Sequence, residues 1–402
     1  MEDVVIRKYD EVRDREGVES FERKCEVGPS GKTSLLTDSM GDPMCRIRHS
    51  PSSVMLVAEV RGREGEIVGV VRGCIRTVTC GRKVPRNGRS GCEESDNKPV
   101  PVFTKAAYIL GLRVSPSYRR KGIGLKLVTR LELWFRDSGA EYAYMATDRH
   151  NEASLGLFTR RLDYIKFRTP TVLVHPVHAH RLRLPSGVRI LRLSSSDAES
   201  LYRSNLSTVD FFPRDIDAVL SNKLTLGTFL AVPSSSVTDF ASFSAAPPQS
   251  WAALSVWNAG DVYKLQVKGL PRAKLAVARA SRLLDRFLPW LRIPSVPEIS
   301  RPFGGLFLYG LTGEGPNSAA LMRGLCRWAH NLGRQRGAGV VVAEVAFCEP
   351  LREGVPHWAR MSFDDMWCIK RLSGGEGYSD GEVGDWTKSP PGTSIFVDPR
   401  EV

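Results

Sequence analysis

The pattern of apolar and polar positions predicts a mixed α/β protein in which strands and amphipathic helices follow one another. Its clearest part is the apolar run at 106–114, which is short, rich in β-forming residues and therefore predicts a buried strand. Pro116 ends this strand, because proline cannot donate to a central ladder. An amphipathic helix is predicted at 125–137, and a second buried strand at 142–147.

Elements of the same two kinds are predicted on both sides of this unit. They are a strand at 4–9, a helix at 14–25, a hairpin of 53–60 with 67–78, a helix beginning at Asn151, and a strand in two pieces at 163–174. Residues 82–101 are rich in glycine, proline, asparagine and serine and contain almost no apolar side chains. They cannot bury enough surface to order themselves, so we predict a mobile insertion.

The second half of the chain repeats this plan, which indicates an internal duplication. The repeated elements are strands at 187–193, 305–311 and 340–345, a hairpin of 228–232 with 251–257, and helices at 197–206 and from Asn317 onward. A chain of 402 residues is long enough for two domains with full cores. We predict domains at 1–178 and 187–372, a linker at 179–186, and a flexible tail at 373–402 that is rich in glycine and proline.

The candidate chemistry lies between the strand at 106–114 and the helix at 125–137. This loop reads Arg119-Arg120-Lys121-Gly122-Ile123-Gly124. Glycines allow consecutive backbone N–H groups to converge on an anion, and a helix N-terminus adds partial positive charge. Three basic side chains surround the same place, so the sequence predicts a phosphate-binding loop.

The motif Arg119-x-x-Gly122-x-Gly124 resembles the pyrophosphate loop of the GNAT (Gcn5-related N-acetyltransferase) family. The helix that begins at Asn151 is similar to the last element of that family that contacts the cofactor. This resemblance implies tandem GNAT folds, each a central mixed β-sheet flanked by helices, with the second copy degenerate.

More narrowly, the opening at 4–10, the segment at 26–32 and the two-part layout resemble the plant HOOKLESS-type probable N-acetyltransferases. The resemblance runs over essentially the whole chain. It implies transfer of an acetyl group from acetyl-CoA to an amine, most of all on a protein such as a histone. It also implies a role in ethylene- and auxin-dependent plant growth and a location in the nucleus, whereas composition alone allows nucleus or cytoplasm.

The GNAT resemblance also assigns residues to acetyl-CoA. Backbone amides of the central strand at 112–114 would hold pantetheine, the basic loop would hold the pyrophosphate, and the helix at Asn151 would position the sulfur. The expected cofactor-binding residues are Leu112, Arg113, Val114, Arg119, Arg120, Lys121, Gly122, Ile123, Gly124, Leu125, Asn151, Ser154 and Phe158.

The catalytic groups depart from the family pattern. Phe158 stands where many members carry a tyrosine that protonates the thiolate, and the strand at 108–114 bears no carboxylate base. The nearest titratable candidates are Tyr144, Asp148 and His150, and Glu59 could reach a basic acceptor through water. This departure keeps open a second hypothesis, a non-catalytic regulator that binds acetyl-CoA and acts through protein or chromatin contacts.

The corresponding loop of the second half has a different character. It reads Thr312-Gly313-Glu314-Gly315-Pro316-Asn317 and contains no arginine or lysine. The Glu314 carboxylate would repel a pyrophosphate, and Pro316 removes an amide donor. We therefore predict that the second copy does not bind CoA and instead has a structural or substrate-covering role.

Charge and metal-ligating residues change this picture little. The net charge of +13 suits an anionic co-substrate and keeps direct DNA binding open as a third hypothesis.

Eight cysteines without a Cys-x-x-Cys pair predict reduced thiols. His175-x-x-His178-x-His180 has no neighbouring carboxylate, which predicts a linker cluster and no metal. No apolar run has membrane-spanning length, and homo-oligomerisation stays open.

Overall fold

The computed structural model describes residues 3–25, 34–62, 65–83, 99–372, 385–388 and 390–402. The segment at 26–32, the centre of the predicted insertion at 84–98 and the start of the predicted tail at 373–384 lie outside the described residues.

The first half of the chain alternates strands and helices much as its sequence predicts. Its elements are β1 (Val4–Lys8), α1 (Glu11–Lys24), β2 (Ser34–Asp38), β3 (Ser52–Val60), β4 (Ile67–Lys83), β5 (Val100–Val114), η1 (Pro116–Tyr118), α2 (Ile123–Asp137), β6 (Tyr142–Asp148), α3 (Glu152–Arg161), β7 (Ile165–Arg168) and β8 (Thr171–Pro176).

The second half contains a similar series with additional helices. Its elements are β9 (Val188–Leu193), α4 (Ser195–Leu206), α5 (Ile216–Leu220), β10 (Thr225–Pro233), α6 (Phe240–Ala245), β11 (Trp251–Asn258), η2 (Ala259–Asp261), β12 (Lys264–Lys268), α7 (Arg272–Phe287), η3 (Pro289–Leu291), β13 (Gly305–Glu314), α8 (Ser318–Gln335), β14 (Val340–Val345), η4 (Pro350–Gly354), β15 (Phe363–Arg371) and η5 (Pro399–Glu401).

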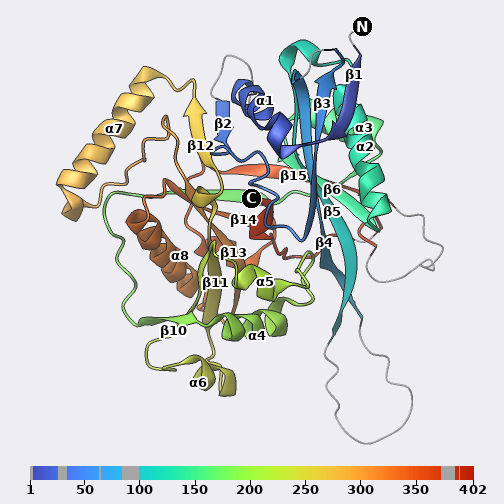
Figure 1. The fold of residues 1–402 in the computed structure, drawn as a ribbon. Coiled ribbons are helices and arrows are strands. Elements are labelled where there is room, and N and C mark those ends of the chain that lie inside the picture. The colour runs from blue at the N-terminus through green and yellow to red at the C-terminus, as the bar shows by residue number, and fades with distance from the viewer. Residues whose placement is uncertain (1–2, 26–33, 63–64, 84–98, 373–384, 389) are drawn as a thin grey trace, which may run out of the picture.

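One large sheet runs through both halves of the molecule (Figure 1). Its strands follow the order β1-β3-β4-β5-β6-β15-β8-β14-β13-β11-β10-β9, and β7 pairs with β15 beside this path. The order is symmetric about its centre: β5–β6 is parallel in the first half, and β13–β14 is parallel in the second. β2 and β12 form a separate antiparallel pair that joins the halves. The predicted fold class, a mixed α/β protein with a duplicated plan, is confirmed.

The two halves exchange one strand each at the centre of the sheet. β8 comes from the first half of the chain but pairs along its length with β14. β15 comes from the second half but pairs with β6 from Tyr142 to Asp148. The sheet therefore continues across the predicted domain boundaries at 178 and 187. The apolar pattern of a strand predicts that the strand is buried, but it does not identify the strands beside it.

Three groups of buried residues hold the sheet between its helices. On one face, α2 packs over the first half through Leu127 and Phe135, and α8 packs over the second half through Leu325 and Ala329. The opposite face carries a single cluster to which strands of both halves contribute, and we call it the common core. Because the halves share this core, they form one packing unit.

The C-terminal segment 385–402 is packed, so the predicted flexible tail is wrong for its described residues. Trp386 stacks on Phe211 with ring centroids 4.3 Å apart, and Phe396 is buried in the common core. Arg400 forms an ion pair with Asp215 at 2.6 Å. The composition suggested a loose segment because glycine and proline are frequent, but its few apolar side chains have a place to be buried.

Three further details follow from the described residues. The predicted insertion is shorter than 82–101, because Arg82 and Lys83 belong to β4 and Val100 begins β5. The seven cysteines in the described ranges are free, in agreement with the predicted reduced thiols. Within the described part of the chain, no helix is long and apolar enough to cross a membrane.

Candidate functional site

The parallel strands β5 and β6 separate in the middle of the first half. Their pairing runs from Ala106 to Ile109 on β5 and ends opposite Met145 on β6. Two residues later β5 has a bulge at Gly111, where φ is +63° and the register with β4 shifts by one residue. Gly111 fits this conformation because it has no Cβ. The bulge turns the end of β5 away from β6, so the backbone at 112–114 is no longer part of that pairing.

The basic loop links η1 to the start of α2. Arg120 and Gly122 both have positive φ, +64° and +80°. The Arg119 Nε atom donates to the Val114 carbonyl oxygen at 3.3 Å, which joins the loop to the end of β5. Arg119, Arg120 and Lys121 are exposed, and the Lys121 ammonium lies 4.5 Å from the centre of the Tyr118 ring.

The N-terminus of α2 has free hydrogen-bond donors. No side chain caps it, and within the described residues the amides of Gly122 to Leu125 have no recorded acceptor. Uncapped amides and the helix dipole together favour an anion at this point, and three exposed cations stand beside it. This geometry suits a phosphate group, and the assignment of the loop to a phosphate stays a prediction.

The first turn of α3 approaches the same loop. A Cβ atom at Gly124 would lie 3.5 Å from Leu157 and 3.8 Å from Val114, so α2, α3 and the end of β5 converge at this glycine. Asn151 caps α3: its Oδ1 accepts from the Ser154 amide at 3.2 Å, and its Nδ2 donates to Thr147 at 2.9 Å. Asn151 and Ser154 therefore define where the helix begins beside the loop.

Two of the residues expected to contact the cofactor are buried in the core under α2. Phe158 is 1% exposed and packs edge-on against Tyr164, with ring centroids 5.1 Å apart. Ile123 is 3% exposed and belongs to the same core. Their side chains support the loop from below, whereas Leu112, Arg113, Val114 and Leu125 remain half-buried at its edge.

Tyr144 points into the common core. Its hydroxyl accepts from Arg76 at 2.9 Å and donates to Glu401, and its ring stacks on Tyr108 and Trp367. Burial raises the pKa of the Tyr144 hydroxyl well above its usual value. The hydroxyl already has two protein partners, so Tyr144 is a structural group rather than the predicted catalyst.

Glu59 is also occupied by structural contacts. It bonds to Arg7 and Arg13, each at 2.7 Å, and to the Gly65 amide at 2.9 Å. Because the Arg7 hydrogen bond holds the pKa of Glu59 below its usual value, this carboxylate is a poor base at neutral pH. These contacts argue against Glu59 as the group that serves the acceptor, and its role there stays a prediction.

Asp148 lies at the exposed end of β6, and its Oδ1 accepts from the His150 amide at 2.7 Å. It stands opposite Asp365 of β15, a residue that no sequence pattern singled out. Beyond β15, the Trp367 Nε1 atom donates to Glu344 of β14 at 2.9 Å. The strand exchange thus brings the half-buried Asp365 to the side of β6, with the half-buried Glu344 two strands further along the sheet on β14.

The loop of the second half differs as predicted in its chemistry. The Asn317 amide, at the start of α8, donates to Ser250 Oγ at 3.2 Å, so one of the terminal donors is already used. Gly315 is in close contact with the chain at Gln249, where a Cβ atom would collide with the carbonyl oxygen. The loop before α8 and the first turn of this helix carry no basic side chain.

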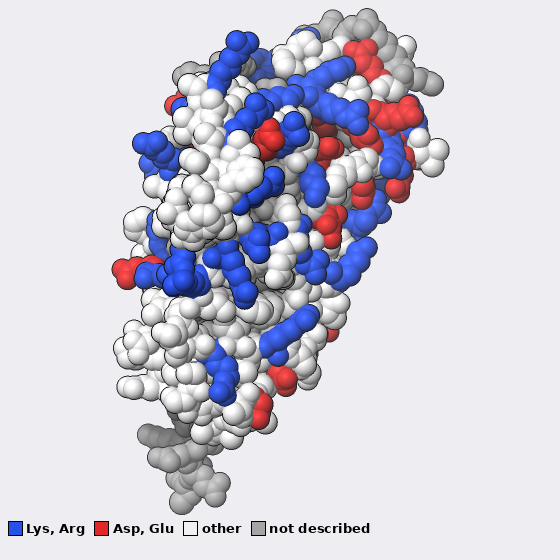
Figure 2. Space-filling model, turned by 90° about the vertical axis from the view of Figure 1, so that its left-hand side faces the viewer, with Lys and Arg blue, Asp and Glu red and all other residues white. Residues whose placement is uncertain are grey.

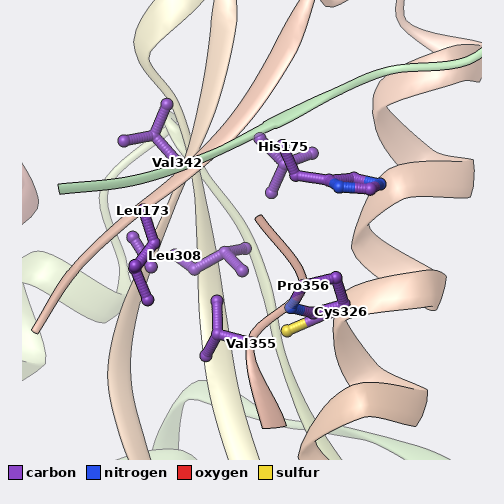
Figure 3. A pocket seen from close by; sticks show the side chains of 9 residues that line it. Leu173, His175, Leu308, Cys326, Val342, Val355 and Pro356 are labelled. Atoms are coloured by element: carbon purple, nitrogen blue, oxygen red, sulfur yellow. The ribbon is translucent and has the colours of Figure 1, made fainter. Parts of the chain in front are cut away.

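A small pocket lies where β13 and β14 separate (Figure 3). Apolar side chains from β8, β13, β14, α8 and the segment after η4 surround it: Leu173, Leu308, Val342, Val355 and Pro356, with Cys326 and His175 at its edge. The equivalent opening in the first half faces the basic loop, whereas this pocket has no cationic group in its lining.

The histidines predicted to form a linker cluster are buried between β8, α7 and α8. His175, His178 and His330 each place a ring nitrogen within 4.8 Å of the others. However, His330 Nε2 accepts from the His178 amide at 2.8 Å, and His178 Nδ1 lies 2.9 Å from the Ser295 carbonyl. His175 lies in β8, so the prediction that it belongs to a linker is wrong. The expectation that these histidines bind no metal stays a prediction.

Basic side chains predominate on the face of the molecule near α7. Figure 2 shows many more lysines and arginines than acidic residues over that face. The charge of +13 is therefore not confined to the loop before α2. A surface of this kind attracts anionic partners in general and does not by itself distinguish nucleic acid from acidic protein.

Comparison with known proteins identifies relatives that match nearly the whole chain. Residues 22–164 match the model of the "Acetyltransferase (GNAT) family". The chain is 55% identical to the probable N-acetyltransferase HLS1 of Arabidopsis thaliana over 406 residues, which covers 99% of both chains. It is 42% identical to the acetyl transferase GW6a of Oryza sativa subsp. japonica, covering 99% of this chain and 97% of that protein.

Solved structures share the fold at low sequence identity. The GCN5-related glucosamine N-acetyltransferase region of a fungal multi-domain β-N-acetylglucosaminidase matches 91% of this chain and 38% of its own, with 14% identity and a TM-score of 0.53. N-myristoyltransferase of Saccharomyces cerevisiae with bound myristoyl-CoA matches 92% of this chain and 79% of its own, with 9% identity and a TM-score of 0.51.

Proposed function

This chain belongs to the GNAT family of acetyltransferases, and we propose that it transfers the acetyl group of acetyl-CoA to an amine on a protein. The observation that carries this proposal is the open N-terminus of α2, with its free amides and its exposed Arg119, Arg120 and Lys121. A pyrophosphate is the part of acetyl-CoA that such a site would recognise.

Each part of the site has a role in this proposal. The amides of Gly122 to Leu125 and the Arg119 side chain would hold the pyrophosphate, and Arg120 and Lys121 would add long-range attraction. The β5 backbone beyond Gly111 would hold the pantetheine arm and orient the thioester carbonyl. Asn151 and Ser154 fix the start of α3. This helix approaches Gly124 and borders the site together with α2 and β5.

Calorimetric titration with acetyl-CoA and with CoA tests the site. In Gly122→Glu, a carboxylate at the helix N-terminus would compete with the phosphates, so we expect affinity to fall by at least about 100-fold. Gly337→Glu is the matched control: Gly337 also has positive φ (+69°) and open surroundings, but it follows α8. Equal losses in both variants would contradict the assignment of the loop.

A second candidate function is a non-catalytic regulator that binds acetyl-CoA. The observation that favours it is Phe158, which is buried and has no proton to give to a thiolate. Acetylation of any peptide amine well above the uncatalysed rate would exclude this candidate. Binding of acetyl-CoA without turnover on a broad panel of basic peptides would support it.

We further propose a nuclear protein that acts in hormone-dependent plant growth, with a histone or another nuclear protein as acceptor. The relatives from two plants and the basic surface support this proposal. Contacts with chromatin and self-association belong to it as well. A fluorescent fusion confined to the cytoplasm, or normal ethylene- and auxin-dependent growth in a plant without the protein, would contradict it.

A further inference from the structure

Two carboxylates and one indole lie on the common-core side of the sheet, on β15 next to β6 and on β14 two strands beyond β15. Glu344 comes from β14, and Asp365 and Trp367 come from β15. Asp365 precedes Trp367 by two residues and therefore lies on the same face of the strand. The Trp367 Nε1 atom donates to Glu344 Oε1 at 2.9 Å and fixes that carboxylate. Both carboxylates are half-buried, so they remain accessible from solvent.

Their position relates directly to the opening between β5 and β6. The parallel pairing of these strands ends at Met145, and the next residues of β6 pair with β15. Trp367 stands opposite Ala146, and Asp365 stands opposite Asp148. The second half of the chain thus places Asp365 beside the part of β6 that borders the expected thioester, and Glu344 lies two strands beyond β15, within reach of Trp367.

The charged groups around the pair make it a proton acceptor near neutral pH. Asp148 of β6 stands opposite Asp365, Asp364 precedes it on the other face of β15, and Tyr108 of β5 is the neighbouring hydroxyl. Within the described residues neither Glu344 nor Asp365 forms an ion pair, because Arg149 pairs with Asp364 instead. Burial raises the pKa of Glu344 to about 8, and the Asp365 carboxylate adds to this rise. Burial raises the pKa of Asp365 to about 7, and the Asp148 and Asp364 carboxylates add to it.

We propose that Glu344 and Asp365 form the catalytic base, which accepts a proton from the ammonium group of the acceptor. This inference rests on the proposed acetyl transfer. The free amine then forms a bond to the thioester carbonyl carbon, and the carbon–sulfur bond breaks. The second proton of the amine passes to the CoA sulfur, and the carboxylate pair releases the first to solvent. No other reactant is required.

The assignment gives the second half a chemical role that its loop cannot supply. It also explains why no base was found on the central strand: the base lies on strands that follow in sequence by about two hundred residues and reach β6 only through the exchange. A partly negative pocket edge further selects a cationic acceptor such as a lysine side chain over a neutral one.

Glu344→Gln and Asp365→Asn test the inference. The substrate is a short peptide with blocked ends and one lysine, and acetylation is followed by mass spectrometry. We expect kcat near neutral pH to fall about 100-fold in either variant, with the Kd of acetyl-CoA unchanged. The loss should shrink at high pH, where the lysine is deprotonated without a base. Glu344→Asp should restore part of the rate.

Asp364→Asn is the matched control, since it removes the same charge one residue away on the opposite face of β15, where Asp364 binds Arg149 and Thr171. We expect near-normal kcat there. Wild-type rates and pH profiles in both Glu344→Gln and Asp365→Asn would overturn the inference and leave the proposed function intact. A wild-type protein that acetylates no peptide would overturn both.

An infrared difference spectrum gives a readout that does not depend on activity. Across the pH range that brackets the two pKa values, about 7 and about 8, the protonated carboxyl band should disappear in the wild-type protein. The band should be altered in Glu344→Gln and Asp365→Asn. In Asp364→Asn it should still disappear as the pH rises, at a somewhat lower pH, because one charge that raises the pKa of Asp365 is removed. A wild-type spectrum without such a band would overturn the inference.

Discussion

At the residue scale, two glycines in equivalent positions give both halves the same bend. Gly111 of β5 and Gly310 of β13 each have φ of +63°, and each lies at a one-residue shift in register. A Cβ at Gly111 would lie 2.9 Å from Arg72 Nη1, and one at Gly310 would lie 2.6 Å from the Tyr202 ring. Both positions therefore require glycine for its conformation and for its size.

Gly111→Ala should destabilise the protein and weaken its binding of acetyl-CoA. The methyl group would strain the bulge and press on Arg72, which bonds to Glu22 at 2.9 Å in the interior. We expect a loss of about 2–4 kcal/mol in the free energy of unfolding and at least about a tenfold rise in Kd. Urea denaturation and calorimetric titration measure the two effects.

Gly62→Ala measures the effect of backbone strain on stability without a steric collision of the added methyl group. Gly62 also has positive φ (+81°), but no atom of the described residues lies within 4 Å of its Cβ position. We expect a loss of about 1 kcal/mol and unchanged affinity for acetyl-CoA. If both variants lose the same stability and neither loses affinity, the bulge at Gly111 does not shape the site.

The buried histidines predict that stability falls in mild acid. Burial lowers the pKa of His175 to about 4 and that of His330 to about 3. Below about pH 6.5 the unfolded chain binds protons that the folded chain does not, so stability decreases as pH falls toward those values. Between about pH 6.5 and pH 5 we expect His330 alone to contribute a loss of about 2 kcal/mol.

His175→Leu provides the control for this pH dependence. Within the described residues neither ring nitrogen of His175 has a hydrogen-bond partner, so leucine should remove a titrating group without removing a bond. Denaturation curves at several pH values should show a shallower slope in the variant and no loss of stability near pH 7. An unchanged slope would mean that His175 does not titrate in this range.

Single residues were predictable where local sequence carries their function. The loop at 119–124 could be identified because its glycines and cations adjoin one another and a helix start. Glu344 could not, since it is a lone carboxylate in an otherwise apolar strand and its partner Trp367 lies 23 residues further on. The only signal was that single charge in a strand predicted to be buried.

At the scale of elements, the C-terminal segment closes the common core. Trp386 bonds to Asp210 and stacks on Phe211, and η5 places Arg400 between Asp398 and Asp215. A chain that ends before residue 385 would expose this part of the core and leave buried charges without partners. Truncation should therefore lower the free energy of unfolding by more than the removal of an exposed terminus would.

Removal of residues 385–402 should lower the free energy of unfolding by at least about 5 kcal/mol, because a buried tryptophan and buried ion pairs are lost together. Thermal unfolding followed by circular dichroism measures the effect. Arg400→Met in the full-length chain removes one buried charge and keeps the apolar contacts of the segment. We expect it to lower the free energy of unfolding by about 3–5 kcal/mol. A truncated protein with the normal melting temperature would contradict the packed segment.

Helices and hairpins were predictable because their periodicity is local. The helix at 125–137 and the hairpin of 53–60 with 67–78 correspond to α2 and to β3 with β4. The helix α7, at Arg272–Phe287, was missed, and several of its apolar side chains are exposed, including Phe287 at 71%. An apolar side chain that faces solvent breaks the correspondence between hydrophobicity and burial on which such predictions depend.

At the scale of the whole molecule, the exchange of β8 and β15 makes the halves depend on each other. Each half lacks a strand of its own sheet unless the other is folded. Calorimetry should therefore show a single transition in which the calorimetric and van't Hoff enthalpies agree. Two separated transitions, or a folded fragment of residues 1–178, would contradict this coupling.

The exchange also sets an order of events during synthesis. The ribosome releases β6 long before β15, so the nascent first half must wait for more than two hundred further residues before its sheet is complete. Until then the edge of β6 exposes unpaired backbone groups to which another chain could bind. The loop proposed to bind acetyl-CoA is therefore synthesised early, whereas Glu344 arrives on β14, shortly before β15, and Asp365 arrives with the strand that closes this edge.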